Sequence, residues 1–299
     1  PAALLGSFDE DFLVVPPEVL IETMQKNQKY FPVLDQQGRL VARFIAVSNI
    51  ESRQPDLVRA GNERVIRPRF ADAKFFWEQD LKQPLAARLE ALDTIVFQHK
   101  LGTLRAKSER IAALARHIAR LLGDDPALAE RAGLLAKCDL TTLMVGEFPS
   151  LQGVMGRYYA AHAGEDACVV HAMDQHYLPR HANDRLPADP CGRAVALADR
   201  LDSLIGIFAI GQRPTGVKDP YGLRRAAIAV LRILIETPLT LDLHALLRRA
   251  ADEYRGAIDT DDSVDAVFAY AMERINGYFG ERGSAGDSVA AVLAVGSTI

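Results

Sequence analysis

From about residue 61 onward, apolar residues recur three and four positions apart, and strand-like alternation stops. This spacing places apolar side chains on one face of a helix. The stretches that follow it include "NERVIRPRFADAKFFWEQDL", "LAARLEALDTIVF", "KSERIAALARHIARLLG" and "SVDAVFAYAMERINGYFGERG". We therefore expect most of the chain to fold as packed amphipathic helices joined by loops rich in Pro, Gly and Asp.

The first 60 residues mix strand and helix signals. Residues 11–16 form a short β-type run, and a helix opened by Pro17 follows them. Residues 30–50 are typical of a strand, a turn at Gly38 and a second strand. We expect a mostly α protein with an N-terminal α/β or α+β part.

The composition is that of a globular protein with room for two domains. The chain has 299 residues, of which 49% are hydrophobic and 25% charged. A formal net charge of -4 excludes a uniformly cationic nucleic-acid binder but leaves room for a local basic face. No apolar run of about 18 residues and no basic-then-apolar leader is present, so we expect neither a membrane span nor a signal peptide. The first residue is not Met, so we expect a fragment of a longer protein.

The three cysteines are Cys138, Cys168 and Cys191, an odd number at wide spacings without a CxxC pair. This pattern predicts neither a disulfide framework nor a zinc ribbon. A reducing compartment fits it best, so we expect a cytoplasmic protein.

The order of the central helices resembles that of the HD superfamily of metal-dependent phosphohydrolases. The blocks that carry the resemblance are "KSERIAALARHIARLL", "AGLLAKCD", "HAMDQHYLPRHANDRLP" and "VALADRLDSL". In that family a His, a His-Asp pair and a late Asp hold a divalent metal whose bound water is the nucleophile. The corresponding positions here hold Lys107, Ala136, Lys137 and Asp199. Since alanine has no donor atom and an ammonium repels a cation, the resemblance implies a metal-free, degenerate site.

A lysine ammonium can take the place of the missing ion. If Lys107 and Lys137 point at the former metal position, they form a buried ion pair with Asp199. This hypothesis requires the Lys137 nitrogen to lie within about 6 Å of the carboxylate of Asp199 or Asp202.

Other residues near this block are weaker candidates for a metal site. Shifting the match to Cys138 and Asp139 turns the pair by about 200° around a helix, so we exclude it. His171 and His176, five positions apart, do not share a helical face, and we expect them to be surface or hydrogen-bonded histidines.

Four longer blocks, read in series, are similar to the bacterial glycyl-tRNA synthetase beta subunit family. They are "GNERVIRPRFADAKFFWEQD", "LGTLRAKSERI", "RAGLLAKCDLTTLMVGEFPSLQGVMGRYYA" and "IGQRPTGVKDPYGLRRAAIAVLRI". The resemblance implies the end of a B3/B4-like α+β domain with a connecting helix at residues 1–80. It further implies a metal-less HD-like helical domain at 81–240 and the truncated start of an anticodon-binding-like helical domain at 241–299.

The same resemblance implies a non-catalytic, tRNA-engaging subunit of glycine–tRNA ligase. The alpha subunit of that family holds ATP, Mg, glycine and the class II active site in an alpha2beta2 assembly, so we expect no catalytic residue, metal or cofactor on this chain. One alternative is a metal-dependent HD phosphohydrolase acting on nucleotide or RNA. Another is a structural partner that holds the alpha subunit and does not bind RNA.

Binding of tRNA requires cations for phosphates and planar groups for unstacked bases. Three stretches provide candidate cations: Lys26 and Lys29; Arg64, Arg67 and Arg69; and Lys218, Arg224, Arg225 and Arg232. Near the second stretch, Phe70 and Trp77 follow helical spacing and are expected in the core. In the third, Asp219 is a candidate helix cap that competes with an anion for the same N–H groups.

Overall fold

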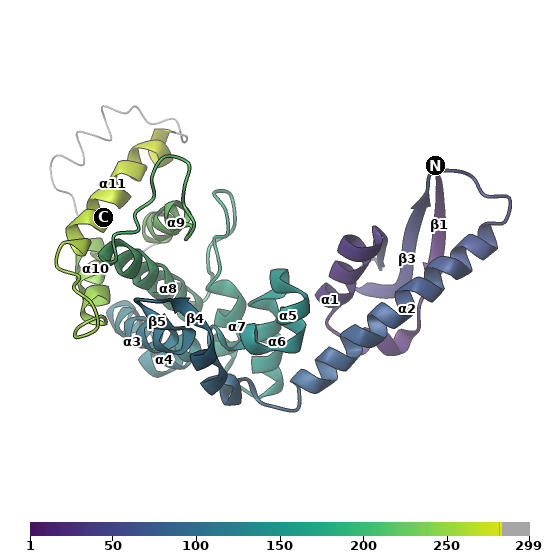
Figure 1. The fold of residues 1–299 in the computed structure, drawn as a ribbon, viewed down its shortest axis with the longest axis horizontal. Coiled ribbons are helices and arrows are strands. Elements are labelled where there is room, and N and C mark those ends of the chain that lie inside the picture. The colour runs from purple at the N-terminus through teal and green to yellow at the C-terminus, as the bar shows by residue number, and fades with distance from the viewer. Residues whose placement is uncertain (238, 281, 283–299) are drawn as a thin grey trace.

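The computed structural model describes residues 1–237, 239–280 and 282 (Figure 1). An N-terminal lobe with a small sheet is joined by one long helix to a larger helical body. Among the described residues, no helix is both long and apolar enough to cross a bilayer. The last part of the predicted C-terminal segment, residues 283–299, lies outside the described residues.

The N-terminal lobe contains a three-stranded antiparallel sheet. Its strands are β1 (Ala2–Ser7), β2 (Phe31–Leu34) and β3 (Leu40–Ser48), in the order β1-β3-β2. The predicted strand, turn and strand is confirmed, and Gly38 adopts a φ of 77° in the turn. Because both strand pairs are antiparallel, this lobe is α+β.

The predicted β-type run at residues 11–16 is wrong. Glu10–Val14 forms a short 3₁₀ helix, and the Asp9 side chain accepts a hydrogen bond from the N–H of Asp11 at its start. The helix predicted to begin at Pro17 is present as α1 (Pro17–Glu22) and continues as a π-helical turn over Thr23–Gln28.

Helix α2 (Pro55–Asp80) begins six residues before the predicted start at 61 and is 26 residues long. It leaves the N-terminal lobe and reaches the helical body (Figure 1). Phe70, Ala73 and Trp77 are buried, as their spacing predicted. Trp77 stacks on Tyr159 of the helical body at a centroid distance of 5.4 Å, so the far end of α2 belongs to the core of that body.

The end of α2 is fixed by the buried carboxylate of Asp80. This carboxylate accepts hydrogen bonds from the N–H groups of Leu143 (3.0 Å) and Met144 (2.9 Å), at the start of α5, and from the Tyr159 hydroxyl (2.9 Å). It also pairs with Arg88 at 3.0 Å. One side chain therefore joins the connecting helix to three other segments of the body.

The helical body is built around α8, which packs against α3, α4, α7, α9, α10 and α11. Most of α8 is buried, in keeping with its central place (Figure 1). The helices of the body are α3 (Leu104–Leu122), α4 (Pro126–Leu135), α5 (Leu143–Glu147), α6 (Val154–His162), α7 (Ala167–Gln175), α8 (Pro190–Ala209), α9 (Leu223–Glu236), α10 (Leu243–Asp252) and α11 (Ser263–Gly280).

The helix predicted over residues 85–97 is wrong. That segment forms two 3₁₀ turns, Leu85–Arg88 and Glu90–Thr94, followed by the short strand β4 (Val96–Gln98). Strand β4 pairs with β5 (Gly102–Thr103). Leu85 and Leu92 are fully buried, so the apolar spacing marked core positions, but tertiary contacts broke the segment into turns.

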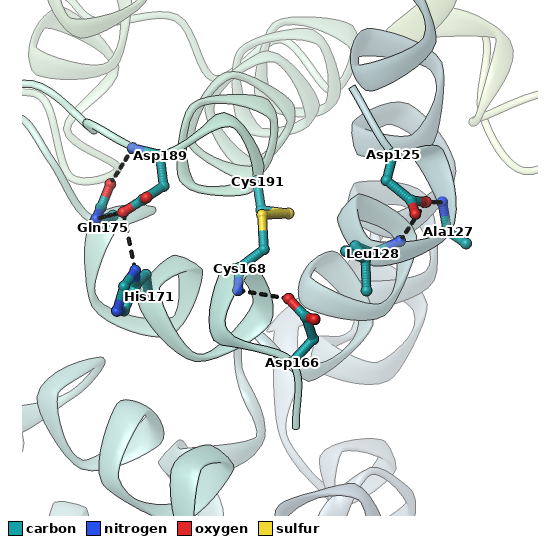
Figure 2. Close-up of a disulfide and its surroundings, with 9 residues drawn as sticks. All are labelled: Asp125, Ala127, Leu128, Asp166, Cys168, His171, Gln175, Asp189 and Cys191. Carbon is teal, nitrogen blue, oxygen red and sulfur yellow. Dashed lines mark hydrogen bonds and ion pairs between the residues drawn. A yellow bond between two sulfur atoms is a disulfide. The ribbon is translucent and has the colours of Figure 1, made fainter. Parts of the chain in front are cut away.

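The expectation that the chain has no disulfide is also wrong. Cys168 and Cys191 are bonded, with Cα atoms 5.8 Å apart (Figure 2). Cys168 lies in the first turn of α7 and Cys191 in the first turn of α8, and these two helices pack together. Their separation of 23 positions gave no signal, because only helix packing brings the two cysteines together.

Other contacts around the disulfide tie the same two helices together. The Asp166 carboxylate accepts a hydrogen bond from the Cys168 N–H and caps α7 (Figure 2). His171, half exposed as expected for a surface histidine, lies 3.2 Å from Asp189 at the start of α8. The Gln175 side chain accepts a hydrogen bond from the N–H of Asp189 at 3.0 Å.

The disulfide predicts a simple labelling result. When the protein is unfolded without reductant and alkylated, we expect mass spectrometry to show modification of Cys138 alone, since it is the free cysteine. After reduction, all three cysteines become modified. A Cys138→Ala variant, unfolded without reductant, serves as the control and should take up no label. Three labels without reductant contradict the disulfide.

Candidate functional site

Three of the four positions singled out by the HD resemblance, Lys107, Lys137 and Asp199, meet in a buried ion-pair cluster. The Lys137 Nζ lies 2.7 Å from Asp199 Oδ2, and the Lys107 Nζ lies 2.9 Å from Asp199 Oδ1. Lys107 comes from α3 and Asp199 from α8, and both lysines are nearly inaccessible to solvent. The hypothesis that these lysines pair with Asp199 is confirmed.

Lys137 does not lie on a helix, contrary to the sequence prediction. Helix α4 ends at Leu135, Ala136 is its C-cap residue, and Lys137 precedes the 3₁₀ turn Cys138–Thr141. Asp139 was excluded because two positions on a continuous helix differ by about 200°, and this argument does not apply here. Even so, the buried Asp139 carboxylate faces elsewhere, because its Oδ2 accepts hydrogen bonds from the N–H groups of Gly153 and Gly156.

His176 is a member of the cluster that sequence reasoning missed. It is fully buried; its Nδ1 lies 3.0 Å from the Ala172 carbonyl and its Nε2 lies 3.1 Å from the Lys137 Nζ. The network assigns the ring proton to Nδ1, so that Nε2 accepts from the ammonium. Burial, reinforced by Lys137, holds the His176 pKa well below its usual value and keeps the ring neutral. The ammonium therefore takes one nitrogen and one carboxylate donor, the groups that a metal ion prefers.

A second carboxylate pairs with two cations of the cluster. Asp202, also on α8, accepts from the Lys107 Nζ at 2.8 Å and from the Arg110 Nε at 2.5 Å. Burial alone would lower the Lys107 pKa, but Asp199 and Asp202 outweigh it and raise that pKa. Burial alone would raise the Asp199 pKa, but Lys107 and Lys137 hold it well below its usual value. The charges of Lys107 and Asp199 are therefore maintained at neutral pH.

This arrangement fits a structural role better than hydrolysis. In the part of the chain that the structure describes, no group of three His, Cys, Asp or Glu side chains converges as a metal site. The donors that remain, His176 and Asp199, are directed at an ammonium, which cannot activate a water as a Lewis acid does. The phosphohydrolase alternative therefore has no support in the site geometry.

The arginines of α2 lie on the surface, as a role in RNA binding requires. Arg64, Arg67 and Arg69 are exposed, and within the described ranges none of them forms an ion pair. Arg64 and Arg67, three positions apart, lie on the same side of the helix. The candidates in the first stretch are more constrained, because Lys26 pairs with Glu22 and the Lys29 Nζ donates to the Lys26 carbonyl.

In the third stretch of candidates, some cations are exposed and others are held by neighbouring groups. Lys218 and Arg225 are exposed, while the Arg224 guanidinium donates to the Gly216 carbonyl. Arg232 was expected to be an exposed cation for phosphate, but this is wrong: it is 6% exposed and pairs with Glu236 at 2.7 Å.

The N–H groups at the start of α9 also have an acceptor within the chain. The Asp219 side chain accepts from the N–H groups of Leu223 (2.8 Å) and Arg224 (3.0 Å), which confirms it as a cap. Helix α9 begins at Leu223, three residues after Pro220. The helix terminus itself is therefore not available to an anion.

Comparison with known proteins assigns the family. The sequence model of the family described as "Glycyl-tRNA synthetase beta subunit" matches residues 1–294. The chain belongs to this family. The glycine–tRNA ligase beta subunit of Chromohalobacter salexigens is 54% identical over 294 residues, which are 98% of this chain and 43% of that protein. The beta subunit of Aromatoleum aromaticum is 52% identical over all 299 residues, again 43% of its length.

A third relative, the beta subunit of Colwellia psychrerythraea, is 49% identical over 294 residues and is covered to 43%. The chain thus spans less than half the length of the curated relatives it matches. Family membership is secure, because the similarity extends over nearly the whole of this chain.

Proposed function

We propose that this chain is a tRNA-engaging, non-catalytic part of a glycine–tRNA ligase beta subunit. The observation that carries the proposal is the Lys137 ammonium, which takes the His176 and Asp199 donors that a catalytic metal would need. Family membership supplies the context, since the relatives are named as subunits of a ligase. Exposed arginines on α2, Lys218 in the loop before α9 and Arg225 on α9 supply cations for RNA.

The proposal includes a partner. A beta subunit implies an alpha subunit, and we place ATP, Mg, glycine and the catalytic site there, in an alpha2beta2 assembly in the cytoplasm. On this chain we assign residues 1–80 to a B3/B4-like segment, 81–240 to an HD-like domain and 241–299 to the start of an anticodon-binding-like domain. The lysine cluster supports the HD-like assignment, because it joins α3, the end of α4, α7 and α8 at one point.

The test is a tRNA titration of the chain, with and without the alpha subunit, over a range of salt concentrations. We expect binding whose log affinity falls linearly with log salt. Arg64→Ala and Arg67→Ala should each reduce the magnitude of that slope by about 0.7 to 0.9 for every phosphate that the variant no longer neutralises.

Arg39→Ala is the matched control, because Arg39 is also exposed but pairs with Asp35 in the N-terminal lobe. It should leave the slope unchanged. Absence of tRNA binding both with and without the alpha subunit would refute the tRNA proposal and favour a purely structural partner. Glycyl-tRNA formation by this chain alone would refute its non-catalytic role.

A further inference from the structure

A cleft of about 500 Å³ opens between the end of α7, the middle of α8 and the start of α9. Its charged lining comprises three arginines, Arg180, Arg200 and Arg225, and one acid, Asp199. Both oxygens of Asp199 are held by lysines, so this carboxylate does not neutralise the arginines. The cleft is therefore cationic.

Arg200, which is half-buried, forms no ion pair within the described residues. Its four hydrogen bonds go to the backbone carbonyls of His176, Ala196, Tyr177 and Pro179. These bonds fix the guanidinium but leave its positive charge in place. A half-buried cation that forms no ion pair favours an anion in the adjoining space.

Two arginines that line the cleft, Arg180 and Arg225, are exposed and can contact a ligand. Within the described residues Arg225 is exposed and makes no ion pair, and Arg180 is exposed and pairs with Asp174 at 3.2 Å. Both also line a neighbouring hollow of about 140 Å³, together with Arg232, and no acidic residue lines that hollow. The positive lining therefore extends beyond the first cleft.

Aromatic groups accompany the arginines. Tyr221, 37% exposed, lies at the edge of the cleft, and Tyr177 forms part of its wall. An arginine fork matches the oxygens of a phosphate, and a tyrosine ring offers a surface on which a base can stack. A cleft of this volume admits a single nucleotide but not a duplex.

We propose that this cleft binds one nucleotide unit, with the phosphate at Arg180 and Arg225 and the base against Tyr221. The nucleotide is either a free mononucleotide or an unstacked residue of an RNA strand, since both present the same phosphate and base. Arg200 contributes its positive charge and not hydrogen bonds, because its own N–H groups largely donate to backbone carbonyls. The inference stands apart from tRNA binding by α2, because a mononucleotide needs only the cleft.

The test is calorimetric titration of the whole chain at low salt with adenosine 5′-monophosphate, adenosine and a single-stranded tetra-adenylate. We expect the two phosphate-bearing probes to bind and adenosine not to bind. Arg225→Ala and Arg180→Ala should each weaken binding about tenfold, and Tyr221→Leu should weaken it several-fold. Arg255→Ala is the control, since that side chain is 80% exposed, pairs with Asp252 and lies outside the cleft.

The two phosphate-bearing probes distinguish the sources. Binding of both supports a free nucleotide as ligand, and binding of the tetranucleotide alone, lost in Arg225→Ala, supports an RNA residue. No binding of either, or binding that Arg225→Ala and Arg180→Ala leave unchanged in variants with wild-type circular dichroism, overturns the proposal. If Arg64→Ala and Arg67→Ala leave the salt slope of tRNA binding unchanged while the chain still binds the mononucleotide, only the proposed tRNA binding by α2 is refuted.

Discussion

Replacing Lys137 by methionine will lower the free energy of unfolding by about 3 kcal/mol. The substitution removes the cation that holds Asp199 and His176, and it leaves a buried carboxylate with Lys107 as its remaining partner. Methionine nearly preserves the volume, so the loss reports charge and hydrogen bonding. Urea unfolding at pH 7, followed by circular dichroism, measures the change.

The control for this substitution is Lys26→Met. Lys26 is largely exposed and pairs with Glu22 one helical turn away, so the expected change is below about 1 kcal/mol. If Lys137→Met also costs less than about 1 kcal/mol, the cluster does not depend on its ammonium. A Lys137→Met, Asp199→Leu double variant that is more stable than Lys137→Met alone will show that the unpaired charge causes the loss.

Replacing Asp80 by alanine will destabilise the protein by about 3 to 5 kcal/mol. The side chain is 1% exposed, and its removal leaves the Leu143 and Met144 N–H groups, the Tyr159 hydroxyl and Arg88 without their acceptor. Because these partners belong to the joint between α2 and the body, protease cleavage after α2 should also accelerate. Urea unfolding and limited proteolysis measure the two effects.

Two further variants make the Asp80 result specific. Asp80→Asn keeps one oxygen acceptor and loses the charge, so we expect an intermediate loss of stability. Asp56→Ala removes an exposed acid at the other end of α2, where it pairs with Arg59, and should change stability by less than about 1 kcal/mol. Equal effects of Asp80→Ala and Asp56→Ala would contradict the importance of the joint.

The sequence by itself determined the helical class, much of the core and the ion pair between Lys137 and Asp199. The spacing of Phe70, Ala73 and Trp77 predicted their burial, because a helix places positions three and four apart on one face. The pairing of Lys137 with Asp199 was also predictable, since the resemblance to the HD superfamily suggested that these oppositely charged side chains meet. Both predictions rest on features that can be read from the sequence alone: the spacing of apolar residues and the residue types at matched positions.

Only the tertiary structure decided the partners that come from distant segments. Packing of α7 on α4 brought His176 to Lys137, and packing of α7 on α8 brought Cys168 to Cys191; no spacing in the sequence relates either pair. The burial of Arg232 depends on Glu236 and on backbone carbonyls 48 and 51 residues away. Helical periodicity fixes which face of a segment is apolar, but the contacts of a polar side chain depend on which other segments pack against it.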